Sequence, residues 1–168
     1  RGNAYALGNT PNLDNLLQNK PMSVVETSGR FVGLPDGIMG NSEVGHTNIG
    51  AGRVVRQAIS RIDEDLENGN FARNPALRGA VQHALTQGGK LHLFGLIGPG
   101  GVHASDGHYQ ALLVLADDMG LPSERVIIHA ILDGRDTPPR SAAFFLRDLE
   151  SMLEQSGGQV ASLCGRFF

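Results

Sequence analysis

The stretch VIIHAIL, residues 126–132, and the DGRDTPP segment that follows it at 133–139 decide the fold class of this chain. A short run of mostly branched apolar residues that ends in turn-forming residues is typical of a buried strand. Similar apolar runs, at 91–97 and 160–163, lie before and after it. We therefore predict three strands, of which the one at 126–132 is the middle one in chain order.

Helical patterns separate the predicted strands. One begins at Ser105 or Asp106 and a second begins at Pro138, and each carries apolar side chains at helical spacing. Strand and helix therefore alternate, which predicts a parallel sheet with right-handed crossovers. Further helices are expected in the first half of the chain, beginning at Pro11, near Ser42, near Val54 and at Pro75.

The composition of the 168-residue chain narrows the class of protein. A hydrophobic content of 40% with 18% charged residues is typical of a globular protein. The formal net charge of -3 argues against a general nucleic-acid binder. The single cysteine, Cys164, excludes an internal disulfide, suits a reducing cytoplasm, and is expected to be buried beside the third strand. No apolar run is long enough to span a membrane, so no membrane association is expected.

The residues that follow the predicted strands form the first candidate site. His103 follows the first strand, Arg135 and Asp136 follow the second, and Arg166 follows the third. Ligands of open parallel sheets bind beyond the carboxyl ends of the strands, so these side chains predict a phosphate or carboxylate site. Asp136 would either hold Arg135 or accept a substrate hydroxyl. The alternative is an ordinary turn with a local ion pair, and a surface or capping role for His103.

The segment MGNSEVGHTNIGAGR, residues 39–53, carries the second candidate. Ser42 stands at the expected start of a helix, where backbone N–H groups point toward an anion, and this favours a phosphate-binding or nucleophilic role. The alternative, which spacing alone favours, is that Ser42 only caps the helix. A nucleophilic serine needs a base or a metal, and we expect His46, one turn on, to point away or to act indirectly.

Taken together, four segments resemble one family. Their order and spacing are similar to those of the cofactor-independent (2,3-bisphosphoglycerate-independent) phosphoglycerate mutases, of the alkaline phosphatase superfamily. The segments are 33–53, 100–103, 132–139 and 165–168. The resemblance implies an α/β fold in two incomplete pieces. Residues 1–57 would be part of an alkaline-phosphatase-like phosphatase domain, and residues 58–168 the first part of a parallel-sheet phosphotransferase domain that binds substrate.

The resemblance also implies an activity. Such an enzyme is a cytoplasmic isomerase of glycolysis and gluconeogenesis that interconverts 3-phosphoglycerate and 2-phosphoglycerate through a phosphoserine intermediate. Ser42 would be the nucleophile and a ligand of one of two divalent metal ions, Mn²⁺, with the remaining ligands outside this chain. His103, Arg135, Asp136 and Arg166 would contact the phosphoglycerate. The full-length protein is expected to be a monomer without a nucleic-acid or membrane partner.

Two departures from the family pattern alter a polar loop near the expected substrate. Gly98-Pro99 stand where the family has Ser-Asp, and Ala104-Ser105 stand where it has Ser-His. We further expect residues 1–168 to be a piece of a longer chain that is inactive on its own. The alternatives are another phosphatase or phosphomutase of the same superfamily, and a phosphate-binding α/β module without turnover.

Overall fold

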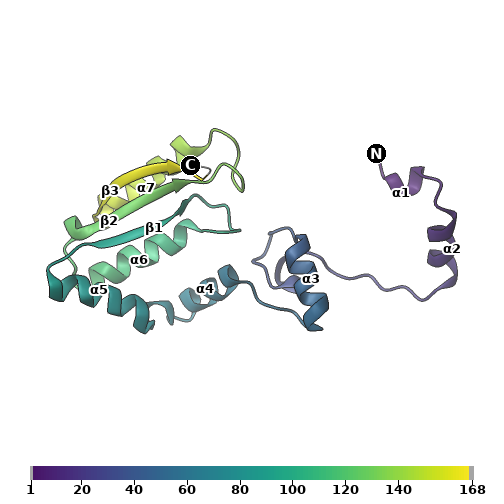
Figure 1. Ribbon diagram of the computed structural model, residues 1–168, viewed down its shortest axis with the longest axis horizontal. Coiled ribbons are helices and arrows are strands. Elements are labelled where there is room, and N and C mark those ends of the chain that lie inside the picture. Colours follow the sequence, from purple (N-terminus) through teal and green to yellow (C-terminus); the bar gives the residue numbers. More distant parts are fainter. Residues whose placement is uncertain (1, 167–168) are drawn as a thin grey trace.

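A three-stranded parallel sheet organises the second half of the chain, as the alternation of strand and helix predicts. The computed structural model describes residues 2–166, so Phe167 and Phe168 of the last motif lie outside the described residues. The strands β1 (Leu91–Ile97), β2 (Val126–Leu132) and β3 (Gln159–Gly165) lie in the order β1-β2-β3 (Figure 1). β2 pairs in parallel with both neighbours, and its pairing with β3 shifts register between Ile128 and His129.

Helices pack against one face of this sheet, and further helices lie toward the N-terminus. They are α1 (Ala4–Leu7), α2 (Pro11–Asn19), α3 (Ser42–Ala51), α4 (Ala58–Glu67), α5 (Pro75–Gln87), α6 (Asp106–Asp118) and α7 (Ala142–Ser156). Short 3-10 turns lie at Gly29–Val32, Phe71–Arg73 and Ser123–Arg125. Figure 1 shows α3 between the sheet and the outlying pair α1 and α2. None of the helices described for residues 2–166 is long and apolar enough to cross a membrane.

One hydrophobic core joins α5, α6 and α7 to the sheet. Ile128 and Ala130 of β2 are fully buried in it, together with Leu113 of α6 and Leu149 of α7. Burial of each such aliphatic side chain contributes about 1.5–3 kcal/mol. Because side chains alternate along a strand, the other face of the sheet carries the intervening residues. On that face Phe94 is 71% exposed, so the second face of the sheet is largely open.

Two predicted helix starts are wrong, and so is the predicted burial of one side chain. The helix expected from Pro138 begins at Ala142, because Pro138 accepts a turn bond from Ser141 and Arg140 adopts a positive φ of 65°. The helix expected near Val54 begins at Ala58, after an extended linker. Cys164 is exposed rather than buried. It lies on β3, which pairs on one side only and is exposed along most of its length.

The first half of the chain contains a separate small core. Val32, Leu34 and Val44 are buried together, and Ile38 packs against them. We call residues 29–56, which hold this core and α3, the Ser42 segment. Gly40 must lack a side chain here, because a Cβ would lie 1.9 Å from the carbonyl oxygen of Thr27. The Ser42 segment is therefore a compact unit that presents the start of α3.

Candidate functional site

The carboxyl ends of the three strands bring the predicted site residues together. Nη1 of Arg166, after β3, lies 2.7 Å from Oδ1 of Asp133 and 2.8 Å from Oδ2 of Asp136, both after β2. Nε2 of His103, in the loop after β1, lies 4.0 Å from the same Oδ2 of Asp136. The two bonds of Arg166 are charged hydrogen bonds, which are stronger than neutral ones and fix the geometry of the groups that make them, whereas His103 is only near Asp136. The structure thus joins one predicted residue from each of the three strand ends.

Asp133 is a member of this cluster that sequence reasoning missed. Its side chain is only 6% exposed, and its Oδ1 accepts backbone N–H bonds from Arg135 and Asp136, each of 3.1 Å. Burial raises the pKa of the Asp133 carboxyl, but these two bonds and Arg166 lower it by more, so the net shift is downward. An aspartate that directly follows a strand and precedes Gly is the signal for such a turn.

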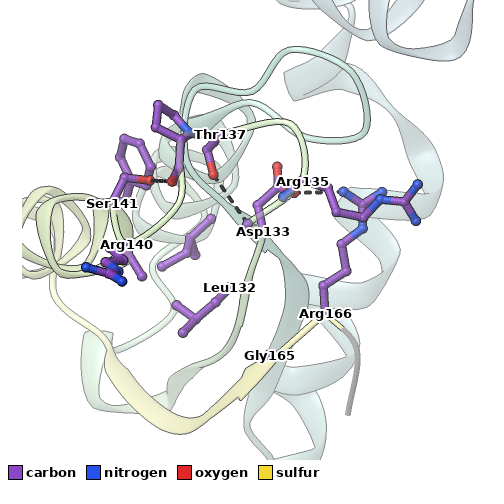
Figure 2. A pocket seen from close by; sticks show the side chains of 13 residues that line it. Leu132, Asp133, Arg135, Thr137, Arg140, Ser141, Gly165 and Arg166 are labelled. Carbon is purple, nitrogen blue, oxygen red and sulfur yellow. Dashed lines mark hydrogen bonds and ion pairs between the residues drawn. The ribbon is translucent and has the colours of Figure 1, made fainter.

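Arg135 has a different environment from Arg166. Asp136 pairs with Arg166 and not with Arg135, so the expectation that Asp136 holds Arg135 is wrong. Within residues 2–166, the exposed Arg135 guanidinium has no carboxylate partner. Figure 2 shows Arg135 and Arg166 extending to the same side of Asp133, with Arg140 on the opposite side. These residues line a cavity of about 460 Å³. A free guanidinium at the mouth of a cavity suits an anionic ligand.

The loop after β1 completes this edge of the sheet. A Cβ at Gly100 would lie 3.1 Å from Oδ2 of Asp133, and one at Gly101, where φ is 69°, would lie 3.0 Å from Ile38. The two glycines therefore let the His103 loop pass between the Asp133 turn and the Ser42 segment. Ser105 occupies the N-cap position of α6 without a side-chain capping bond. Oδ1 of Asp106 instead accepts a 2.8 Å bond from the Gly98 N–H and ties α6 to the end of β1.

Ser42 is the first residue of α3 and does not cap it. Asn41 occupies the N-cap position and accepts a 3.0 Å bond from the backbone N–H of Val44. This geometry removes the capping explanation for Ser42, which spacing alone favoured. The Ser42 side chain is exposed and lines a cavity of about 720 Å³. Its hydroxyl therefore lies at the positive end of a helix, where an anion is favoured.

His46 points toward Ser42, so the first of the two alternatives expected for it, that it points away, is wrong. Its Nδ1 lies 2.7 Å from the carbonyl oxygen of Ser42 and 3.2 Å from Oγ of Ser42. A carbonyl oxygen only accepts hydrogen bonds, so Nδ1 must carry the proton that this bond requires. A protonated Nδ1 cannot take a proton from Oγ. In this arrangement His46 is therefore a helix contact and not the general base for Ser42.

The residues present do not form a metal site by themselves. Within residues 2–166, no three His, Cys, Asp or Glu side chains lie close enough together to hold a metal ion. Ser42 Oγ is the candidate ligand that the resemblance provides, and a single hydroxyl does not bind a divalent cation without further oxygen or nitrogen ligands.

His92, His108 and His129 make contacts within the fold. His92, on β1, places Nδ1 at 2.9 Å from Nε2 of His129 on β2, and Nδ1 of His129 lies 2.7 Å from Oγ of Ser162 on β3. The Phe94 ring stacks on His129 at 4.0 Å between centroids. These side chains cross the open face of the sheet, so both histidines have a structural role. His108 bonds to Asp63, as described below.

Fold and site together define a class of protein. A parallel sheet whose carboxyl edge gathers arginine, histidine and carboxylate side chains, near a helix that begins at an exposed serine, is typical of an α/β protein that binds a small phosphorylated ligand. Residues 62–168 match the family described as BPG-independent PGAM N-terminus (iPGM_N). The chain belongs to this family.

Curated relatives and one solved structure agree with this assignment. Proteins named 2,3-bisphosphoglycerate-independent phosphoglycerate mutase from Thiobacillus denitrificans and Hahella chejuensis are 52% and 48% identical to the chain. Each match covers 99% of this chain and 32% of the relative, so the chain spans about a third of their length. The structure titled "Crystal structures of Leishmania mexicana phosphoglycerate mutase at low cobalt concentration" matches with a TM-score of 0.73 and 35% identity, covering 95% of this chain and 30% of that one.

Proposed function

We propose that this chain is the N-terminal part of a cytoplasmic cofactor-independent phosphoglycerate mutase, a monomer that interconverts 3-phosphoglycerate and 2-phosphoglycerate in glycolysis and gluconeogenesis. One observation carries the proposal. Arg166, Asp136 and His103 come from three different strand ends and meet at one edge of the sheet, beside the unpaired Arg135. The names of the relatives, which are phosphoglycerate mutases, support the same substrate class.

In this proposal the sheet edge binds substrate and Ser42 accepts the phosphoryl group. Arg135 and Arg166 balance the negative charge of the phosphate, while His103 and Asp136 contact the glycerate. Oγ of Ser42 forms a bond to phosphorus as the bond between phosphorus and the glycerate oxygen breaks, and the hydroxyl proton of Ser42 passes in net terms to that oxygen. The reverse transfer to the other glycerate hydroxyl completes the reaction. The arginines act by position and charge, which dominate phosphoryl transfer.

The proposal divides the chain between two domains. Residues 1–57 contribute to the phosphatase domain with Ser42, and residues 58–168 contribute to the substrate-binding phosphotransferase domain. The start of α4 at Ala58 and the start of the family match at residue 62 support this boundary. Closure of the two domains would keep the glycerate in place between the two transfers.

Two divalent metal ions, manganese in this proposal, would lower the pKa of the Ser42 hydroxyl and so supply the activation that His46 does not. The remaining ligands would come from outside residues 1–168, and we therefore expect this chain alone to show no turnover. The solved relative was studied with cobalt, which supports metal dependence. A coupled mutase assay of residues 1–168 with added Mn²⁺ tests this expectation, and turnover would contradict it.

The decisive experiment replaces Ser42 in the full-length protein. Ser42→Ala should abolish conversion of 3-phosphoglycerate to 2-phosphoglycerate and should prevent recovery of a phosphorylated peptide that contains residue 42. The matched control is Thr47→Ala, which removes an exposed hydroxyl from the same helix. Normal mutase rates in Ser42→Ala would exclude the phosphoserine route. Activity toward other phosphorylated substrates, without mutase activity, would indicate a different phosphatase or phosphomutase of the superfamily; phosphate binding without any turnover would indicate a binding module.

A further inference from the structure

The helix α4 connects the Ser42 segment to the sheet, and side chains of α4 make polar contacts in both directions. Its first turn is bonded to the Ser42 segment: the carbonyl oxygen of Gly33 accepts from the backbone N–H of Gln57 and from Oγ of Ser60, each at 2.9 Å. The side chain of Asn48 joins the preceding linker to the same segment, since it donates to Val32 and accepts from the N–H of Val55. The start of α4 therefore moves with Ser42.

Further along α4, Asp63 bonds to α6, one of the helices that pack on the sheet. Its Oδ1 lies 2.7 Å from Nε2 of His108 on α6, whose side chain is only 16% exposed. The first turn of α6 is anchored in turn, because Asp106 accepts the Gly98 N–H at the end of β1. His108 also follows the His103 loop by a few residues. The Asp63–His108 pair thus links α4, the helix bonded to the Ser42 segment, to the elements that carry the anion site.

Hydrophobic packing supports α4 mainly through Ile59, which is buried, while Ile62 and Leu66 are only partly buried. Neither hydrophobic cluster of the described residues includes a side chain from α4. Another close approach, between Ile38 and Gly101, joins the Ser42 segment to the loop after β1. A helix held by few apolar contacts depends on its polar contacts for orientation, and a partly buried charged hydrogen bond is the strongest kind available.

We propose that His108 and Asp63 are positioning residues that set where Ser42 stands relative to the Arg135–Arg166 edge. This inference rests on the proposed function. Neither residue touches the candidate substrate edge, so their loss should leave phosphoglycerate binding intact. It should slow the transfer between substrate and Ser42, because a small displacement of a reacting group lowers the rate steeply.

Kinetics of the full-length protein test the inference. His108→Gln and Asp63→Asn should each lower kcat roughly tenfold and leave KM within about twofold, the pattern of a lost contribution to the transition state. The double variant should be no worse than either single variant, because both remove one interaction. Asp63→Glu should recover part of kcat. The control is His83→Gln, which changes an exposed histidine on α5 and should have no effect.

A distance measurement tests the same inference without using activity. Spin labels at Thr47→Cys on α3 and Glu154→Cys on α7, in a full-length background in which Cys164 and every cysteine outside residues 1–168 are replaced by Ser, should give a narrow distance distribution that shifts or broadens in His108→Gln. An unchanged kcat and an unchanged distribution would overturn the inference, as would a fall in kcat that only follows a loss of folded protein. If Ser42→Ala keeps full mutase activity, the phosphoserine route fails, and the label distances still decide whether the pair positions α3.

Discussion

Arg166 and Asp136 are 30 residues apart in the chain, yet Nη1 of the arginine lies 2.8 Å from Oδ2 of the aspartate. Asp136 lies a few residues after β2, and Arg166 directly follows β3. The parallel pairing of these two strands places the two residues side by side. The same arginine atom also contacts Asp133. The site edge and the sheet are therefore coupled, because a change in the pairing of β3 moves Arg166.

The two arginines should respond differently to substitution. Arg166→Ala removes a partner from two carboxylates, so it should lower the stability of the protein as well as its affinity for phosphoglycerate. Arg135→Ala should lower affinity at nearly unchanged stability, since no carboxylate depends on it. Loss of one charged hydrogen bond to the ligand costs about 1.5–3 kcal/mol, or roughly 10- to 150-fold in affinity. Calorimetric titration and thermal unfolding measure the two effects, with Arg147→Ala on the exposed side of α7 as the control.

Asp133 should make the stability of the protein depend on acid pH. Its pKa is lowered in the folded state, so the folded protein binds this proton less readily than the unfolded chain does. The contribution of Asp133 is then complete above the unfolded pKa of about 4 and is lost as the pH falls through the lower, folded value. We expect Asp133→Asn to be destabilised at pH 7 and to approach the parent protein below pH 4.

Urea unfolding at pH 7 and at pH 3 measures this difference. Asp117→Asn, which changes an exposed aspartate near the end of α6, serves as the control and should give the same small effect at both values. If the free energies of unfolding of Asp133→Asn and the parent protein differ by the same amount at pH 7 and at pH 3, the carboxylate charge contributes nothing to stability.

Tyr109 should be a site where removal of a polar atom stabilises the protein. Among the described residues its hydroxyl is buried without a hydrogen-bond partner, and burial, with a smaller contribution from Asp106, raises the pKa of the phenol to about 12. An unpaired buried polar group costs about 1–3 kcal/mol. Tyr109→Phe should therefore raise Tm, and a lower Tm would indicate a partner such as a bound water.

Gly95 provides a second test of the same contact. A Cβ at Gly95 would lie 2.5 Å from the hydroxyl oxygen of Tyr109. Gly95→Ala should therefore destabilise the protein, and Tyr109→Phe should restore part of the loss. Thermal unfolding of the two single variants and the double variant gives the coupling energy. Additive effects would mean that Tyr109 is not what restricts residue 95.

His46→Gln should lower the mutase rate by less than about tenfold, whereas loss of a general base lowers rates by about 10²- to 10⁴-fold. The effect should be small because Nδ1 of His46 donates its proton to the carbonyl oxygen of Ser42 and so cannot accept a proton from the Ser42 hydroxyl. Initial rates of the full-length protein at saturating substrate measure the effect. A loss comparable to that of Ser42→Ala would show that His46 takes part in the proton transfer.

Much of the fold was predictable because its signals are local. The apolar runs around 126–132 and 91–97 give the strands, and the alternation with helices gives parallel pairing, which the structure confirms. Pro138 was misleading, since proline favours the first turn of a helix but fits an open turn equally well. The exposure of Cys164 depends on which strand lies at an edge, and strand order is a tertiary property that spacing does not contain.

The candidate site, like the fold, was predictable only in part. The principle that ligands bind at strand ends places His103, Asp136 and Arg166 at one edge, and the structure brings them together there. Which carboxylate holds which arginine depends on side-chain directions, so the pairing of Asp136 with Arg135 was wrong. The link between Asp63 and His108 spans 45 residues and joins two helices, and no local pattern marks it.

The open face of the sheet has a practical consequence for anyone who expresses these residues alone. Phe94 of β1 stands in solvent on that face, and β3, on the other side of β2, offers an edge strand on which Val160 and Leu163 are exposed. Unprotected strand edges next to apolar side chains promote self-association. Preparations of residues 1–168 should therefore bind hydrophobic dyes and precipitate at concentrations that a protein with both sheet faces covered tolerates.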